Sequence, residues 1–94
     1  MTVYAIVQVD VKNAEEYAKY AEIAGPTVAK FGGEFLARGG KVEVMEGETR
    51  DRCVIIQFPD METAKTFYHS DDYQRALGFA LPVSVRDYKF VEGV

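Results

Sequence analysis

The sequence of 94 residues predicts a single α+β domain over residues 1–94, with four strands and two helical regions in the order βαββαβ. Two short runs rich in β-branched residues, VYAIVQV at 3–9 and RCVIIQF at 52–58, predict strands. Each run is followed by a segment with apolar residues at helical spacing and then by another extended segment. This order is typical of the ferredoxin-like sandwich, whose antiparallel four-stranded sheet has its first and third strands at the centre.

The first helix is predicted to begin after Asn13, which forms a variant of the capping box with Glu16. The apolar residues that follow at helical spacing are Tyr17, Tyr20, Ala21, Ala24 and Val28. Gly25 and Pro26 predict a kink or a fresh turn, because proline lacks the backbone donor and pushes the preceding residue out of helical geometry. The glycine pair at 32–33 is expected to end the helix.

The two remaining strands are predicted with less apolar character. EFLARGGKVEVMEG at 34–47 reads as one long strand in which Gly39 and Gly40 mark a bulge or bend. EGETRD then turns the chain back toward residue 52. SVRDYKFV at 84–91 has alternating character and supplies the last strand. Both carry several charges, which favours positions at the edges of the sheet.

The stretch FYHSDDYQ at 67–74 contains a second helix start inside what would otherwise be one amphipathic helix. Asp60 caps the first piece, and Ser70 is a good N-cap for the second. We therefore predict two helices that meet at His69 and Ser70, the second running from 71 to 80. Its apolar residues should face inward and close one side of a cleft; they include Tyr73 and Leu77.

The composition excludes several classes of partner. A formal net charge of −4 argues against the basic surface that a nucleic-acid binder needs and against a polybasic membrane anchor. The start MTVYAIVQVD lacks the basic region of a secretory signal, so we expect a cytoplasmic protein. The single cysteine, Cys53, lies in an apolar run and is expected to behave as a small hydrophobic residue.

Both faces of the two central strands carry apolar side chains. With both helices on one face of the sheet, the other face would expose residues such as Ile6 and Ile55 to water. An open apolar sheet face is an aggregation hazard for a monomer. We therefore expect a second copy of the chain to cover it, sheet against sheet, in a homodimer.

Three segments carry a resemblance to a known family: FGGEFLARGGKVEVMEG at 31–47, VIIQFPDMETAKTFYHSDDYQ at 54–74 and the closing VEGV at 91–94. Together they resemble the bacterial family called domain of unknown function thirteen-thirty, which belongs to the dimeric α/β-barrel superfamily. The resemblance covers essentially the whole chain and implies a ferredoxin-like protomer that dimerises through its sheet. It implies no reaction, since the superfamily includes monooxygenases, lactone isomerases, haem-handling enzymes and ligand-sensing domains.

Chain topology gathers several polar residues toward one end of the predicted sheet. With Arg52 beside them, these polar residues could hold a small anionic or carbonyl compound between the sheet and the helices. The alternative is a surface ion pair, for instance between Asp10 and Arg86. The candidate ligand-binding residues are Asp10, Arg38, His69, Tyr73 and Arg86.

We expect neither a metal nor a bound cofactor. His69 is the only histidine, and no spacing of carboxylates around it is typical of a metal site. As a haem ligand or a general base it would have to point into a cavity, whereas an exposed histidine at the end of a helix is commoner. Tyr17 and Tyr20, one turn apart, could line a pocket or belong to the core.

Two functions of different classes remain open at this point. One is a cofactor-independent enzyme acting on a small oxygen-bearing compound, in which Arg38 orients the substrate and His69 or Tyr73 moves a proton. The other is a non-catalytic dimeric ligand-binding or sensing domain that uses the same cleft. No triad of nucleophile, base and orienting residue is readable from the spacing, which weakens the first.

Overall fold

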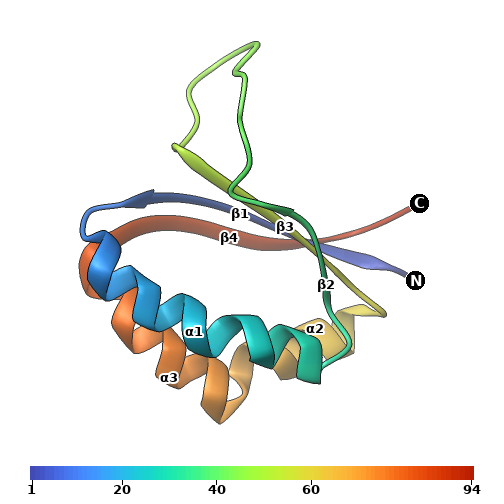
Figure 1. Ribbon diagram of the computed structural model, residues 1–94. Coiled ribbons are helices and arrows are strands. Elements are labelled where there is room, and N and C mark those ends of the chain that lie inside the picture. Colours follow the sequence, from blue (N-terminus) through green and yellow to red (C-terminus); the bar gives the residue numbers. More distant parts are fainter.

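The computed structural model describes all residues, 1–94, as a four-stranded antiparallel sheet with three helices on one face (Figure 1). The strand order is β2-β3-β1-β4, so the first and third strands are central and the predicted βαββαβ sandwich is confirmed. No helix combines the length and the apolar character that crossing a bilayer requires. The elements are β1 Val3–Val11, α1 Ala14–Lys30, β2 Glu34–Arg38, β3 Arg52–Phe58, α2 Met61–His69, α3 Asp71–Ala80, a 3-10 turn at Leu81–Val83 and β4 Ser84–Glu92.

Alternation along β1 separates two faces of the sheet, which we call the helical face and the open face. Val3, Ala5, Val7 and Val9 lie on the helical face and are at most 3% exposed. The residues between them lie on the open face and are only half-buried. There Ile6 pairs directly with Ile55 of β3. The open face is therefore apolar at its centre, as the sequence predicts.

Helix α1 has the predicted start and end. The Asn13 side chain accepts a hydrogen bond from the Glu16 backbone N–H at 3.1 Å. At the other end Gly32 adopts φ 76°, and the N–H groups of Gly32 and Gly33 donate to the carbonyls of Ala29 and Val28. This is a Schellman ending, which a left-handed glycine makes sterically easy.

Of the kink or fresh turn predicted at Gly25 and Pro26, the fresh turn is wrong, because α1 runs through both residues. Ala24 and Val28 on either side are buried in the core, and that packing holds the helix together. Pro26 and Glu22, whose carbonyl loses its helical donor, are both exposed, so the lost hydrogen bond falls on the solvent side.

The predicted long strand over 34–47 is also wrong. Strand β2 ends at Arg38, and its irregularity lies at Leu36 rather than at the glycines. Gly39 takes φ 74°, which redirects the chain out of the sheet. Residues 39–51, which we call the arm, then project from the side of the sheet opposite the helices (Figure 1). Val42, Val44 and Met45 of the arm are exposed.

The predicted double start of the second helical region is confirmed. Ser70 has extended backbone between α2 and α3, and its Oγ accepts a hydrogen bond from the Tyr73 backbone N–H at 3.2 Å. The same hydroxyl donates to the Phe67 carbonyl at 2.7 Å, so one side chain ends α2 and begins α3. Helix α3 lies alongside α1 (Figure 1), and Tyr73 and Leu77 are buried as expected.

Replacing Ser70 by alanine should lower the free energy of unfolding by about 1 kcal/mol, because the first turn of α3 loses its cap. Chemical denaturation of the two proteins measures the difference. Thr66→Ala is the matched control, since Thr66 is exposed inside α2 and its hydroxyl only bonds the carbonyl one turn back. An equal loss in both variants, or none in Ser70→Ala, would contradict the capping role.

Candidate functional site

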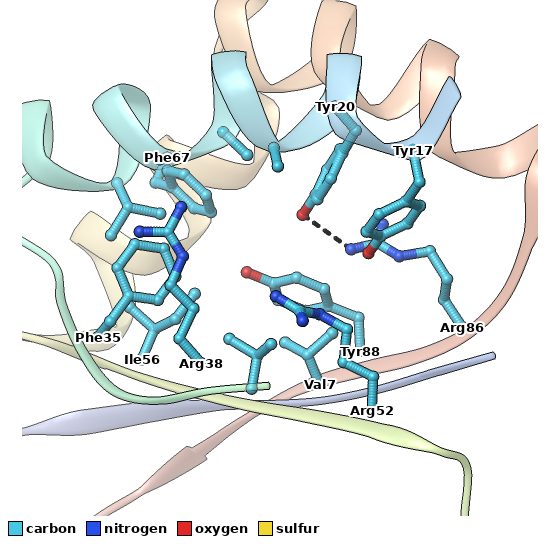
Figure 2. Close-up of a pocket in the computed structure, with 15 residues that line it drawn as sticks. Val7, Tyr17, Tyr20, Phe35, Arg38, Arg52, Ile56, Phe67, Arg86 and Tyr88 are labelled. Atoms are coloured by element: carbon cyan, nitrogen blue, oxygen red, sulfur yellow. Dashed lines mark hydrogen bonds between the residues drawn. The ribbon is translucent and has the colours of Figure 1, made fainter. Parts of the chain in front are cut away.

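A cavity of about 40 Å³ lies between α1 and the helical face of the sheet (Figure 2). Its floor is apolar and comes from the two central strands through Val7, Val54 and Ile56. Tyr17 and Tyr20 project from α1 toward the sheet on one side of the cavity, and Phe35 and Phe67 line the other side (Figure 2). Of the 15 residues that line the cavity 11 are hydrophobic, so its few polar groups determine what it can recognise.

The strand register brings three arginines to this apolar face. Val9 of β1 pairs with Arg86 of β4 on one side and with Arg52 of β3 on the other. One row further along the sheet, Val54 pairs with Arg38 of β2. Because paired residues point to the same face and Val9 is buried beneath the helices, all three guanidinium groups reach the cavity.

Two glycines make room for two of these arginines. A Cβ at Gly25, in the middle of α1, would come within 2.9 Å of Arg38 Nη2. A Cβ at Gly39 would overlap the guanidinium of Arg52. Glycine inside a helix costs about 1 kcal/mol relative to alanine. Gly25 thus leaves space for Arg38, and it also relieves the clash that a Cβ before Pro26 would cause inside the helix.

Arg86 lies in a cluster of tyrosines. Its Nη2 donates to the Tyr20 hydroxyl at 2.8 Å and its Nη1 to the Tyr73 hydroxyl at 3.4 Å. The two hydroxyls are 3.1 Å apart and hydrogen-bonded to each other. The guanidinium also lies 4.6 Å from the ring centroid of Tyr20, within cation–π range. The Arg86 Nε and the Tyr88 hydroxyl are buried and have no hydrogen-bond partner.

No carboxylate accompanies the three cavity arginines. The chain has five arginines; Arg50 is paired with Asp10 and Asp87, and Arg75 with Asp72. Arg38, Arg52 and Arg86 have no carboxylate oxygen within 4.0 Å, although acidic residues outnumber basic ones in this protein. The cavity therefore carries positive charge that the protein itself does not neutralise.

The charge states of the cluster are fixed around neutral pH. Burial raises the pKa of Tyr73 to about 12 and raises the pKa values of Tyr20 and Tyr88 as well. Burial alone would lower the pKa of Arg86, but attraction to the negative charge that Tyr20 and Tyr73 gain when they ionise at high pH outweighs that effect, and the pKa is raised overall. The tyrosines are thus neutral hydrogen-bond donors, and the arginine keeps its charge.

The raised tyrosine pKa values predict that the protein loses stability above about pH 10. In that range the unfolded chain releases tyrosine protons that the folded protein retains, so each retained proton costs up to about 1.4 kcal/mol per pH unit. Below pH 10 these tyrosines are protonated in the folded and the unfolded protein, so they do not make the free energy of unfolding depend on pH. Urea unfolding at about pH 9 and pH 11 measures the change, which should be smaller in Tyr73→Phe. Equal stability at both pH values would contradict burial of the hydroxyls.

The structure brings together some of the residues singled out from sequence. Arg38 and Arg86 line the cavity, and Tyr73 reaches Arg86 with its hydroxyl. His69 is exposed, in a shallow surface depression with Glu62 and other polar residues, and does not contact the cavity. Asp10 lies on the open face of the sheet, where it bonds Arg50.

The ion pair between Asp10 and Arg86, considered as an alternative, does not form. Arg86 pairs with Val9 in the strand register, so it lies on the helical face, whereas Asp10 lies on the open one. The sequence places Arg52 near the site and offers Tyr17 and Tyr20 as pocket or core residues, and all three line the cavity, but it does not predict the role of Tyr88. The signal available in the sequence was alternation in β4, which puts Arg86 and Tyr88 on the same face as Phe90 of the core.

Comparisons with known proteins agree with this fold. The sequence model of the family described as "Domain of unknown function (DUF1330)" matches residues 2–94. No curated protein matches the chain. A protein of unknown function from Rhodopseudomonas palustris, RPA0582, superposes with a TM-score of 0.80 at 18% identity, covering 99% of this chain and 82% of that one.

Two further solved structures share the fold at low identity. A dimeric ferredoxin-like protein of unknown function from Jannaschia sp. CCS1 gives a TM-score of 0.78 at 14% identity, with 99% of this chain and 100% of that chain covered. SnoaB from Streptomyces nogalater, a cofactor-independent oxygenase, gives 0.62 at 12% identity, with 99% and 93% covered. At such identities the similarity establishes the fold alone.

Proposed function

The chain belongs to the family described as a domain of unknown function (DUF1330), and we propose that it binds a small oxygen-bearing compound in the cavity under α1. The observation that carries this proposal is the set of three arginines without carboxylate partners above an apolar floor. Arg52 and Arg86 are half-buried, and a charge in such a position is costly when nothing pairs with it, so such groups are retained where a ligand completes them. The apolar floor supplies contact for the rest of the molecule.

The lining of the cavity favours binding or polarisation over proton abstraction. None of the 15 lining residues is Asp, Glu, His or Cys, and the tyrosines are neutral around neutral pH. As an enzyme, the protein would act by stabilising negative charge on a substrate oxygen through Arg86 and Tyr20. SnoaB shows that this fold supports oxygenation without a cofactor in another protein.

A non-catalytic ligand-binding or sensing domain is the second candidate, and the missing general base favours it. Both functions use the same cavity, but only the enzyme converts its ligand into a product. Once a ligand is identified, its consumption under air by catalytic amounts of protein would support the enzyme. Stoichiometric binding with the ligand recovered unchanged would support the sensing domain.

We also propose that the working form is a homodimer formed through the open face of the sheet. Ile6 and Ile55 lie side by side at its centre, and Leu36 and Val91 are exposed on the edge strands. The arm projects on the same side and carries exposed Val42, Val44 and Met45. This apolar surface suits a second copy of the chain, and the Jannaschia protein is described as dimeric.

A cytoplasmic location is part of the proposal. Cys53 is a free cysteine, half-buried in β3. A free thiol without a partner is usual for proteins kept in a reducing compartment.

Arg38 is the arginine best suited to a first test of the cavity. It is exposed at the mouth, and its guanidinium lies 4.1 Å from the ring centroid of Phe35, so its removal should not disturb the core. Any compound that stabilises the wild type in a thermal-shift screen should bind Arg38→Ala about tenfold more weakly, because one of the three positive charges that line the cavity is lost. Arg75→Ala, on the outer face of α3, is the control. Undiminished stabilisation in Arg38→Ala would remove Arg38 from the site.

A further inference from the structure

The polar groups of the cavity are almost entirely hydrogen-bond donors. Each guanidinium offers five N–H groups and no acceptor. Within the cluster Arg86 uses one N–H to Tyr20 and one to Tyr73, and the two hydroxyls bond each other. The Arg86 Nε and the Tyr88 hydroxyl are buried without any partner. Buried polar groups are nearly always satisfied in native proteins, so the missing partner is an acceptor.

The charge of the cavity narrows the class of acceptor. Three guanidinium groups line it, none of the 15 lining residues is acidic, and Asp10 of β1 is paired with Arg50 instead. A neutral carbonyl compound would satisfy hydrogen bonds but leave the positive charge unpaired. An anion satisfies both requirements at once.

The shape and size of the cavity narrow the class of ligand further. A cavity of about 40 Å³ has room for a few atoms beyond a single water site, which suits a flat group such as a carboxylate. Arginines bind phosphate as well as carboxylate, but phosphate sites commonly add backbone N–H groups at a helix N-terminus. Here α1 presents the side of its second and later turns to the cavity, through Tyr17, Tyr20 and Ala24, and its first residues do not line the cavity.

On these grounds we propose that the ligand is a small monocarboxylate with an apolar or aromatic body. Its carboxylate lies among Arg86, Arg52 and Tyr88, and its body lies over Ile56 toward Phe35. This inference rests on the proposed function, because it names the chemical class of the compound that the same cavity binds. Arg38 at the mouth is exposed and has no ion-pair partner, so it can move aside to admit a body larger than the closed cavity.

The two glycines support a site built for arginines rather than a chance gathering of charge. Alanine at Gly25 would crowd Arg38, and alanine at Gly39 would collide with Arg52. Gly39 also has φ 74°, so a substitution there is unfavourable for the backbone as well. Gly25 has an ordinary helical φ, but it precedes Pro26, whose ring would crowd a Cβ in helical geometry, so this glycine serves the helix as well as the space for Arg38.

The test compares acids with amides of the same shape. Thermal shifts of the full chain are measured with acetate, propionate, benzoate and phenylacetate, each against its amide, at constant ionic strength, with inorganic phosphate as a further arm. We expect a saturable rise in melting temperature with the apolar acids, strongest for benzoate or phenylacetate, and none with the amides. Arg86→Met should abolish the rise, while Arg75→Met should keep it.

Each contrary outcome has a distinct meaning. Equal shifts with acids and amides would overturn the carboxylate proposal and leave a ligand-binding cavity in place. A phosphate shift larger than that of any acid would replace the proposed class by a phosphate compound. No shift with any member of either series would overturn this inference and count against the cavity as a small-molecule site. If Arg86→Met fails to fold, the comparison of acid with amide on the wild type still decides.

Discussion

At micromolar concentration the protein should elute as a dimer, with a light-scattering mass twice that of its 10.5 kDa chain. The reason is the open face of the sheet, where Ile6 and Ile55 are neighbours in the register and no helix covers them. Leu36, at the irregularity in edge strand β2, is 53% exposed in the single chain. Burial of this surface against a second copy supplies the hydrophobic free energy for association.

Ile6→Glu should convert the dimer into monomers or unfold the chain, because a buried unpaired carboxylate costs several kcal/mol. Light scattering and circular dichroism together separate these two results. Thr66→Glu is the matched control, because it adds the same side chain and charge at an exposed position of α2. This variant should remain dimeric. A wild-type monomer, or a dimer that persists in Ile6→Glu, would show that the open face is not the interface.

Arg86→Met should raise the free energy of unfolding of the ligand-free protein by about 1–2 kcal/mol while abolishing its response to ligands. The guanidinium is held among tyrosines with its Nε unsatisfied and no carboxylate nearby, so the folded state carries an uncompensated charge. Replacing buried charged groups with apolar residues of similar size is often stabilising. A binding site that costs the protein stability is a common trade-off.

Urea unfolding of wild type, Arg86→Met and Arg75→Met measures this effect. Arg75 is exposed and paired with Asp72 at 3.6 Å, so its replacement should change the free energy of unfolding by less than about 0.5 kcal/mol. A loss of more than about 1 kcal/mol in Arg86→Met would assign the residue a structural role. In that case the hydrogen bonds to Tyr20 and Tyr73 would outweigh the unpaired charge.

Local signals predicted most of the fold correctly. The strand over 52–58 and the helix starts at Asn13, Asp60 and Ser70 are all as expected, because caps and runs of β-branched residues act within a few positions of the chain. The errors arose where tertiary contacts decide. Core packing carries α1 through Pro26, and the alternating pattern after Gly39 lies in the arm, where no strand of the same chain pairs with it.

The sequence predicted only part of the candidate site, because tertiary contacts decide the rest of it as well. Position along the strands brought Arg38 and Arg86 to the correct end of the sheet, but position alone does not separate the faces; the alternation along β1 puts Asp10 on the face of Ile6, away from Arg86. His69 ends α2 on the surface, away from the cavity. The Tyr88 hydroxyl became significant only once its burial and missing partner were visible.

The most direct test of a carboxylate-binding cavity follows the arginine side chains by NMR. The Nε–H resonances of the five arginines are recorded during a titration with benzoate and, separately, with benzamide, and Arg86 is assigned by its loss in Arg86→Met. Benzoate should shift the Arg86 and Arg52 signals in a saturable way and leave Arg75 unchanged, while benzamide should shift none of them. An Arg86 signal that does not move, or that moves equally with benzamide, would contradict the proposed site.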